Sequence, residues 1–352
     1  MYLRGLGTAH PARRYTKAEC WAAFKGSEWF NKLDRRARTI AELVLSSENG
    51  IEARRLALDR LDDVFTIDPD TLHARFLANA PRLAAQAAER ALADGGLPLE
   101  HVDGLVVSTC TGYLCPGLTG YVVEQLGLRR DVSAFDLVGH GCAAALPNWQ
   151  LADALLASGR CDNVLSVCVE VSSAAMYLDN DPGVLVSACL FGDGAGAALL
   201  SAEPGGRARR VECKAIGSVL NPAERAALRF EQRQGMLRNV LTRPVPRLAA
   251  EHAEQLLDRV LDDEGVDRSE IGTWIWHAGG RDVLAALRNR LGLSEHDVRY
   301  SAAMLREFGN LSSAFVYFVL EAALADGARP GWWWMSSFGA GFSCHGALLE
   351  VA

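Results

Sequence analysis

The sequence lacks several features that define other classes of protein. It contains no run of 18 uncharged apolar residues, and residues 1–15 lack the apolar stretch of a secretory signal peptide. We therefore expect a cytoplasmic protein without membrane insertion. It also has no basic tail, and its net charge is −7, which argues against nucleic acid as a partner.

The cysteines lack the spacing of a metal site or a disulfide framework. No two stand at Cys-x-x-Cys spacing, and none combines with histidine at the spacing of a zinc site. The nine cysteines are an odd number, and most lie in apolar, strand-like runs. We expect free thiols in a reducing compartment and no bound metal.

What the sequence does have is enough apolar residues for a large core, since 49% are hydrophobic and 22% are charged. Residues 1–75 hold charged, amphipathic segments and predict a peripheral helical flap. Beyond them strands and helices alternate, and the same order of elements returns after a polar stretch near residue 208. We therefore predict an N-terminal half over residues 76–208 and a C-terminal half over residues 209–352.

The two halves share one spacing. Glycines and strand ends recur at a separation of 168 residues, in the pairs Gly104 and Gly272, Thr109 and His277, Gly112 and Gly280, Gly141 and Gly309, and Gly159 and Gly327. The type of element also stays in register. This pattern predicts an α/β fold built from duplicated βαβαβ halves.

Cys142 is the first candidate for chemistry. It follows an apolar strand and a Gly-His-Gly turn, and it precedes a predicted helix. Backbone N–H groups at the start of a helix lower the pKa of a thiol and can hold an oxyanion, so a nucleophile is expected here. The alternative is a small buried hydrophobic residue, which is the commonest environment of cysteine.

His277 and Asn310 complete a set with Cys142. At the spacing of 168 residues Asn310 is the equivalent of Cys142, and His277 ends the first strand of the second half. Taken singly, Asn310 is better explained as a helix N-cap, and the alternative for His277 is a core histidine. Together a thiol, an imidazole and an amide at corresponding strand and helix ends are the groups that thioester chemistry needs.

Five motifs, in order, resemble those of the type III polyketide synthases, the chalcone synthase-like branch of the thiolase superfamily. They are GHGCAAA, LFGDGAGAAL, HAGGRDVL, GNLSSAFV and FGAGFS. Ketoacyl synthase III enzymes usually carry His-Gln-Ala-Asn where this chain has His277-Ala278-Gly279-Gly280, which favours the polyketide branch. The resemblance implies a thiolase-like fold with a five-layered αβαβα core. It also implies an acyltransferase without a cofactor, because coenzyme A thioesters are the substrates.

The resemblance assigns roles to individual residues. Cys142 carries the acyl chain, His277 keeps the thiolate paired, and His277 with Asn310 stabilises the enolate formed when malonyl-CoA loses CO2. Phe191 matches the aromatic gate between the coenzyme A tunnel and the cavity, and Asn239 stands near a second gate. Further positions match residues around the cavity or the coenzyme A tunnel: Cys110, Thr111, Cys115, Glu170, Ser172, Ser187, Gly279 and Gly280.

The expected partners follow from the same resemblance. They are malonyl-CoA, an acyl-CoA starter and a second copy of the chain, since the Cys115-Pro116 loop, often with a cis peptide, matches one that crosses a homodimer interface. The family's plant members bind coenzyme A phosphates with spaced lysine and arginine, whereas this chain has SSENGIEARR. Arg54 and Arg55 are candidates for that role, and so are the cationic residues of the preceding segment, Lys32, Arg35, Arg36 and Arg38; a solvated surface explains either set equally well.

The predicted function is iterative condensation of malonyl-CoA onto a starter, followed by cyclisation to a resorcinol- or pyrone-type product. Two alternatives stay open. One is a ketoacyl synthase III-like enzyme or acyltransferase that uses an acyl carrier protein and condenses once. The other is a non-catalytic partner subunit of a synthase.

Overall fold

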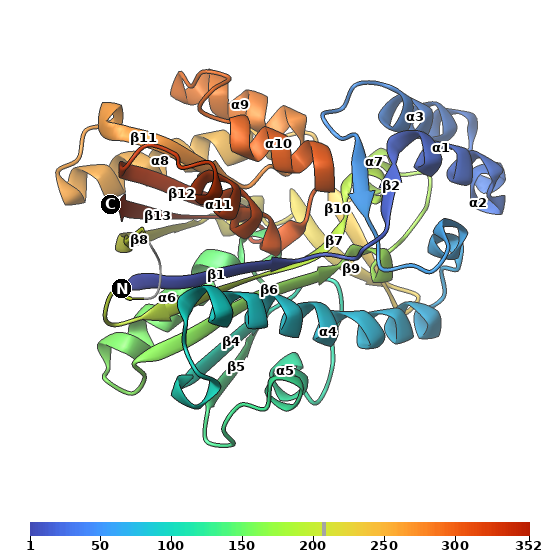
Figure 1. Ribbon diagram of the computed structural model, residues 1–352. Coiled ribbons are helices and arrows are strands. Elements are labelled where there is room, and N and C mark those ends of the chain that lie inside the picture. The colour runs from blue at the N-terminus through green and yellow to red at the C-terminus, as the bar shows by residue number, and fades with distance from the viewer. Residues whose placement is uncertain (206–208) are drawn as a thin grey trace.

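One large sheet runs through the part of the chain that the structure, a computed structural model, describes: residues 1–205 and 209–352 (Figure 1). Nine strands of this part join in the order β5-β4-β6-β7-β1-β8-β13-β12-β11. In that order their bounds are Ser133–Leu137, Gly104–Ser108, Asn163–Val171, Asp193–Ser201, Tyr2–Ala9, Val211–Leu220, Ser343–Val351, Gly331–Gly339 and Ile271–Trp276.

The sheet is two copies of one arrangement. Outward from the middle, the first half reads β1-β7-β6-β4 and the second reads β8-β13-β12-β11, with the same parallel and antiparallel pairs. The halves meet where β1 pairs with β8, at Tyr2 and Glu212. Both ends of β6, Asn163 and Val171, stand 168 residues before the ends of β12. The predicted duplication is confirmed.

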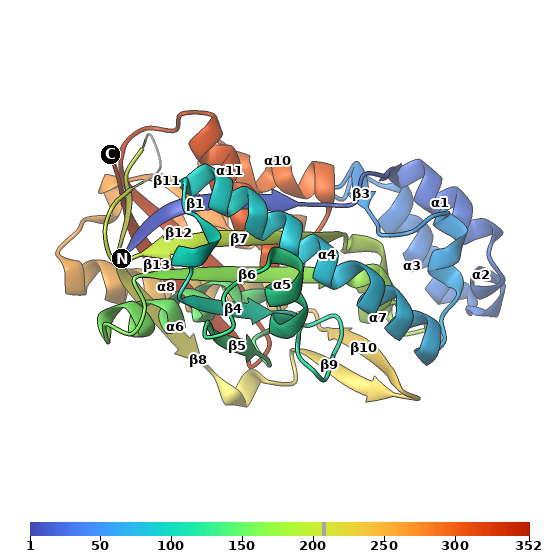
Figure 2. The same cartoon turned by 60° about the horizontal axis from the view of Figure 1, so that its bottom comes forward.

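Helices complete the five layers (Figures 1 and 2). α4 and α5 cover the outer face of the first half, α8 covers that of the second with α9 packed against it, and α6 and α11 lie between the halves. Their bounds, in chain order, are Pro69–Gly95, Leu118–Leu126, Ala145–Ala157, Val245–Glu264, Arg281–Leu291 and Phe315–Ala325 for α4, α5, α6, α8, α9 and α11. The αβαβα core is therefore confirmed.

The two central helices are joined at equivalent positions. Trp149 of α6 and Tyr317 of α11 are 168 residues apart, and the Trp149 Nε1–H donates to the Tyr317 hydroxyl at 3.1 Å. The same hydroxyl lies 2.8 Å from the Ser166 hydroxyl. All three residues are fully buried. Buried polar groups need such partners, so this contact fixes the two halves against each other.

The N-terminal flap was predicted too broadly. Its first residues, Tyr2–Ala9, form β1 at the centre of the sheet, and α4 already begins at Pro69. Glycines concealed the strand because they lower strand propensity. They are needed for packing, since a Cβ at Gly5 would lie 2.0 Å from the Ala91 carbonyl oxygen of α4.

The rest of that segment does form a separate layer, at the right of Figure 1. Its helices pack around their own apolar cluster, which includes Phe24 and Leu45. The elements are β2, α1, α2, α3 and β3, with bounds Arg14–Thr16, Lys17–Gly26, Glu28–Lys32, Arg35–Ser46 and Ala53–Arg55.

Several elements were not predicted. α7 (Pro182–Leu190) precedes β7 where a strand was expected from residue 189. A hairpin of β9 (Leu228–Arg233) and β10 (Met236–Leu241) forms its own two-stranded sheet. α10 (Arg299–Phe308) stands where the 168-residue spacing would place a copy of β5. The predicted boundary at residue 208 lies outside the described residues, and no described helix is long and apolar enough to cross a membrane.

Candidate active site

Cys142 lies in a tight turn between β5 and α6. The turn Gly141–Ala143 is a 3-10 helix, and Gly139 and Gly141 on the way into it have φ angles of 93° and 55°. Glycine adopts such angles at little cost, which explains the glycine pattern before the cysteine. The thiol stands at the start of α6, as predicted, and it borders a cavity.

The expected lowering of the thiol pKa is wrong for the free protein. Burial of the Cys142 sulfur raises its pKa, a hydrogen bond from Ser312 lowers it, and the charge of Glu170 raises it; together these effects give a pKa of about 12. Burial disfavours the charged form more strongly than the helix start favours it. Cys142 is therefore a neutral thiol near pH 7 when no ligand is bound.

Ser312 and Glu170 lie behind the thiol. The Ser312 hydroxyl is 3.3 Å from the Cys142 sulfur and 3.1 Å from a Glu170 carboxylate oxygen. Ser312 also has a φ of 51°, which is uncommon for a residue other than glycine. Such backbone strain occurs where the surrounding structure holds a side chain in place, so this serine is held toward the sulfur.

Glu170 is fully buried at the end of β6 and is surrounded by donors. A buried carboxylate without partners would be very costly, and here every nearby polar group donates to it. In addition to Ser312, five groups donate to the Glu170 carboxylate: the Thr109 hydroxyl at 3.3 Å, the Cys110 N–H at 3.0 Å, the Cys110 thiol at 3.3 Å, the Thr111 hydroxyl at 2.9 Å and the Ser313 hydroxyl at 2.5 Å. Glu170 thus organises the floor of the site from behind instead of lining it.

The Asn310 amide has a fixed orientation. Its Oδ1 accepts from the Ser312 N–H at 2.8 Å, and its Nδ2 donates to the Gly279 carbonyl oxygen at 3.2 Å. Only one assignment of oxygen and nitrogen satisfies both contacts. Within the described part of the chain, one N–H of the amide remains for a ligand. The helix-cap alternative holds in part, because Asn310 does accept from the turn that leads into α11.

His277 is buried directly after β11. Its ring meets Phe315 edge-on, with centroids 5.4 Å apart, and its Nδ1 has no partner among the described residues. Burial lowers the pKa of His277 to about 3. The imidazole is neutral in the free protein, so it can both accept a proton and donate one.

A chain of contacts connects the segments that carry the three predicted residues. Cys142 contacts Ser312, Ser312 and Asn310 share a hydrogen bond, and Asn310 donates to Gly279, two residues after His277. Sequence analysis gave no role to Ser312, although it lies in the quoted GNLSSAFV motif. Its distance of two residues from Asn310 was the available signal.

Strand β12 connects the thiol and the imidazole from the other side. The Ser336 carbonyl accepts from the His277 N–H at 2.9 Å, and the adjacent Ser337 hydroxyl donates to the Ala143 carbonyl at 3.1 Å. Ala143 follows Cys142 in the turn. Neighbouring residues of one strand therefore fix the backbone at both positions.

The cavity beside Cys142 encloses about 700 Å³, its open mouth included. Of the predicted substrate residues, those that line it are Cys110, Thr111, Ser172, Ser187 and Phe191, and Asn239 lines it too. Gly279 and Gly280 lie at the Asn310 side, before α9. Cys115 is exposed and forms the anticipated cis peptide with Pro116.

Phe191 and Asn310 are held together by their backbones. The two residues form an isolated parallel bridge, in which the Gly192 N–H donates to the Asn310 carbonyl and the Asn310 N–H donates to the Leu190 carbonyl, both at 2.9 Å. Gly309 makes this approach possible, since a Cβ there would lie 2.6 Å from the Leu190 carbonyl oxygen. The backbone of the predicted gate is therefore tied to that of the predicted enolate donor.

Arg54 and Arg55, two of the residues considered for coenzyme A phosphates, already have other partners. Arg54 is buried and donates to the Ala188 and Phe191 carbonyls at 2.9 and 3.2 Å. Arg55 pairs with Glu307 at 2.8 Å. Arg54 thus supports the backbone before β7, and a phosphate would have to compete with these contacts.

A thiol, an amide donor and a neutral imidazole on connected segments of a duplicated α/β fold are the groups that acyl transfer through a cysteine thioester requires. Two family models match the chain. Residues 59–221 match the FAE1/type III polyketide synthase-like proteins, and residues 218–351 match the C-terminal domain of chalcone and stilbene synthases.

Relatives and solved structures agree. The chain is 33% identical to a 3,5-dihydroxyphenylacetyl-CoA synthase of Streptomyces toyocaensis, over 98% of this chain and 89% of the relative. A synthase of the same name from Amycolatopsis balhimycina is 33% identical over 76% of this chain and 73% of the relative. The crystal structure of PKS-I from the brown alga Ectocarpus siliculosus superposes with a TM-score of 0.89 at 26% identity, covering 99% of this chain and 97% of that one.

The structure of 1,3,6,8-tetrahydroxynaphthalene synthase from Streptomyces coelicolor has the same fold, with a TM-score of 0.87 at 24% identity over 99% of both chains. The chain belongs to the type III polyketide synthases.

Proposed function

We propose that this synthase builds its polyketide on Cys142, with His277 and Asn310 as the groups that act on the substrates. The observation that carries the proposal is the connection of the Cys142 sulfur, through Ser312, to an Asn310 amide whose orientation is fixed. The same contacts account for loading, decarboxylation and condensation.

Loading begins with the neutral thiol. As the Cys142 sulfur attacks the starter thioester, its proton passes to His277, the bond from the carbonyl carbon to coenzyme A sulfur breaks, and the coenzyme A thiolate leaves with that proton. Forming thiolate and imidazolium together costs less than forming either ion alone in a buried site, because each charge compensates the other.

The extension step needs hydrogen-bond donors that stabilise the enolate, and it needs no general base. Malonyl-CoA loses CO2 when its C–C bond breaks, and the electron pair moves into a thioester enolate. In this proposal the unused N–H of Asn310 and the His277 imidazole stabilise that oxyanion, in a site from which the bound substrate excludes water. The enolate carbon then attacks the acyl group on Cys142 and releases the thiolate, which leaves the chain, longer by one ketide unit, as a coenzyme A thioester. The Cys142 sulfur attacks that thioester, the bond to coenzyme A sulfur breaks, and coenzyme A leaves as in the loading step.

The product proposed is of the resorcinol type. The support is the likeness to the dihydroxyphenylacetyl-CoA synthases, whose cyclised product is named in their description. The starter is a coenzyme A thioester, no resident cofactor takes part, and the protein acts in the cytoplasm. Phe191 and the other lining residues select the starter by the shape of the cavity.

The working unit proposed is a homodimer. The edge strand β5 carries exposed Phe135, with 39% of its surface accessible, and the neighbouring loops carry Tyr113 at 73% and Val138 at 68%. Large apolar side chains that gather at one sheet edge are typical of an interface. The Cys115-Pro116 loop follows β4, the strand that pairs with the edge strand β5.

One experiment tests the function. The purified protein is incubated with radiolabelled malonyl-CoA, alone and with a panel of acyl-CoA starters, and both CO2 release and products are measured. We expect CO2 release together with an aromatic product from at least one starter. The absence of both from every starter would refute the proposal, and activity that requires an acyl carrier protein would favour the single-condensation alternative.

A further inference from the structure

The hairpin of β9 and β10 forms one wall of the cavity. Its two strands join through a two-residue turn at Gln234 and Gly235, whose φ angles are 52° and 75°, as a tight hairpin requires. Phe230 and Asn239 face each other across the strands, and both line the cavity. The position of this hairpin therefore decides how closed the cavity is.

The next pair along the hairpin faces the other way. Glu231 and Arg238 are cross-strand partners, and side chains alternate between the two faces of a strand. While Phe230 and Asn239 contact the cavity, this neighbouring pair lies on the opposite face. Contacts that fix the Arg238 side chain therefore also fix the hairpin that forms this wall of the cavity.

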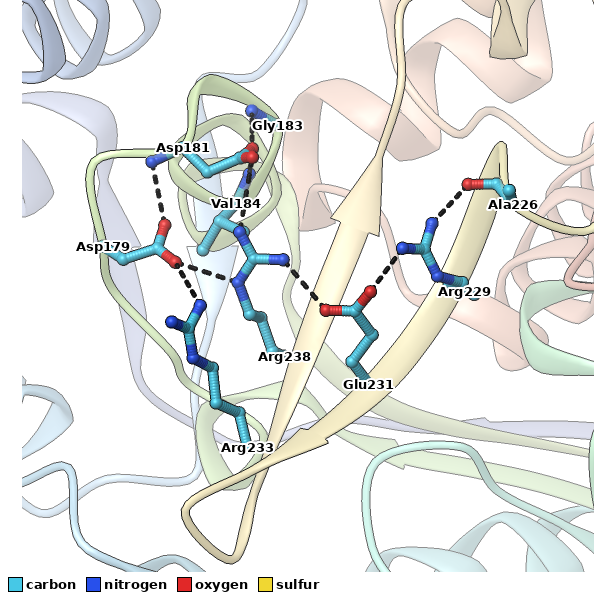
Figure 3. A network of polar contacts seen from close by, with 9 residues as sticks. All are labelled: Asp179, Asp181, Gly183, Val184, Ala226, Arg229, Glu231, Arg233 and Arg238. Carbon is cyan, nitrogen blue, oxygen red and sulfur yellow. Dashed lines mark hydrogen bonds and ion pairs between the residues drawn. The ribbon is translucent and has the colours of Figure 1, made fainter.

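Arg238 is held by three carboxylates, as Figure 3 shows. Its Nε donates to Asp179 at 2.9 Å, and its two terminal nitrogens lie 3.3 Å from Asp181 and 3.2 Å from Glu231. The residue is 8% exposed. A guanidinium has the planar set of donors that such a three-way contact needs, which a lysine lacks.

Asp179 and Asp181, the two carboxylates outside the hairpin, belong to the adjoining wall. Asp181 caps α7, accepting from the Gly183 and Val184 N–H groups at 2.8 and 3.2 Å, and Val184 lines the cavity. The first turn of α7 touches the end of β10, since a Cβ at Gly183 would lie 2.0 Å from the Leu241 carbonyl oxygen. Arg238 thus joins two walls of one cavity.

A second arginine of the same cluster, Arg233, can be compared with Arg238. Arg233, on the same hairpin, also reaches Asp179, but at 3.9 Å and with 59% of its side chain exposed, against 10% for Arg238. Exposed ion pairs contribute little, whereas removing one partner of a buried pair leaves uncompensated charge. Of these two arginines, Arg238 is the one placed to fix the hairpin.

We propose that Arg238 is a positioning residue that keeps the hairpin closed over the growing polyketide. The inference rests on the proposed function, because it concerns the chain carried on Cys142. If the hairpin separates from α7, water reaches the thioester and chains leave before the last extension. Arg238 touches no substrate and acts only through the wall.

The test compares Arg238→Met with Arg233→Met, which removes the same kind of group from the same hairpin. Products from one accepted starter are separated by liquid chromatography with mass detection, and the ratio of prematurely released to full-length chains is measured. We expect Arg238→Met to raise this ratio about tenfold, because it removes a largely buried cation and leaves three partly exposed carboxylates without it. Arg233→Met should leave it unchanged, and Arg238→Lys should restore it in part.

Two further measurements keep the result decisive. Hydrogen exchange of residues 228–241 should accelerate in Arg238→Met, while strands β4 and β6 keep their protection. Asp179→Asn, which keeps Arg238, should show the same changes in weaker form if Arg238→Met fails to fold. An unchanged product ratio in either folded variant, or unchanged exchange in the hairpin, would overturn the inference. If the unmodified protein makes no polyketide, the proposed function fails, and the role in retaining the chain fails with it.

Discussion

The Ser312 hydroxyl lies between two acceptors, 3.3 Å from the Cys142 sulfur and 3.1 Å from Glu170. It has one proton to donate. With Cys142 neutral, the carboxylate is the stronger acceptor, and once a thiolate forms, the sulfur competes for the proton. Ser312 and Glu170 therefore act on the thiol in opposite directions.

The pH dependence of alkylation follows from the two burial effects. Because the pKa of Cys142 is raised to about 12 and that of His277 is lowered to about 3, both groups stay neutral near pH 7. The thiolate fraction, and with it the rate of alkylation by iodoacetamide, should rise about tenfold per pH unit from pH 7 to 10. Mass spectrometry of the Cys142 peptide measures this rate. A plateau near pH 6 would show a resting thiolate and imidazolium pair instead.

Ser312→Ala should slow that alkylation. The serine hydroxyl lowers the pKa of Cys142 by donating to the thiolate, so its removal leaves the pKa higher and the thiolate rarer. A hydrogen bond to a charged group contributes about 1.5 to 3 kcal/mol, so we expect a rate about ten- to a hundredfold lower at pH 8. Ser313→Ala serves as the control, because Ser313 donates to Glu170 and not to the sulfur. Equal rates for Ser312→Ala and the unmodified protein would rule out the proposed contact.

Glu170→Gln should have the opposite effect on reactivity. The negative charge of Glu170 raises the pKa of Cys142, so its neutralisation should increase the thiolate fraction and the alkylation rate at pH 8. The amide would also place an NH2 group against donors that now meet oxygen, and we expect a loss of about 2 kcal/mol in the free energy of unfolding. Denaturant titration measures the second effect. Slower alkylation in a folded Glu170→Gln protein would contradict the electrostatic argument.

Tyr317→Phe should weaken the joint between the halves. The phenylalanine would leave the buried Trp149 Nε1–H and the Ser166 hydroxyl without a shared partner. An unsatisfied buried donor costs about 1 to 3 kcal/mol. Thermal or urea unfolding should report that loss. Tyr113→Phe is the matched control, since Tyr113 is 73% exposed, and an equal effect of the two substitutions would refute the role assigned to Tyr317.

The duplicated halves and the candidate thiol, imidazole and amide could be predicted because they depend on local patterns. Apolar strands, glycines at turns and the 168-residue spacing are all visible in the sequence, and β6 and β12 follow that spacing at both ends. β1 was missed because Gly5 is explained only by its contact with α4, which is distant in the chain.

The pKa of Cys142 could not be predicted for a similar reason. The local sequence places the thiol at a helix start, but the burial that dominates its pKa comes from segments far away in the chain. The Arg238 cluster likewise joins residues 59 positions apart. No periodic pattern marks such contacts, so only the folded structure reveals them.

The most direct test of the central claim is the identity of the residue that carries the acyl group. Asn310→Ala should load a starter but decarboxylate malonyl-CoA slowly, about a hundredfold below the unmodified protein, as when one oxyanion donor is removed. This variant is incubated with an accepted acyl-CoA and digested, and its peptides are analysed by mass spectrometry. The account predicts the starter acyl mass on the peptide containing Cys142 and on no other cysteine peptide. An acyl group found elsewhere, or no adduct in a folded variant that still binds the acyl-CoA, would contradict it.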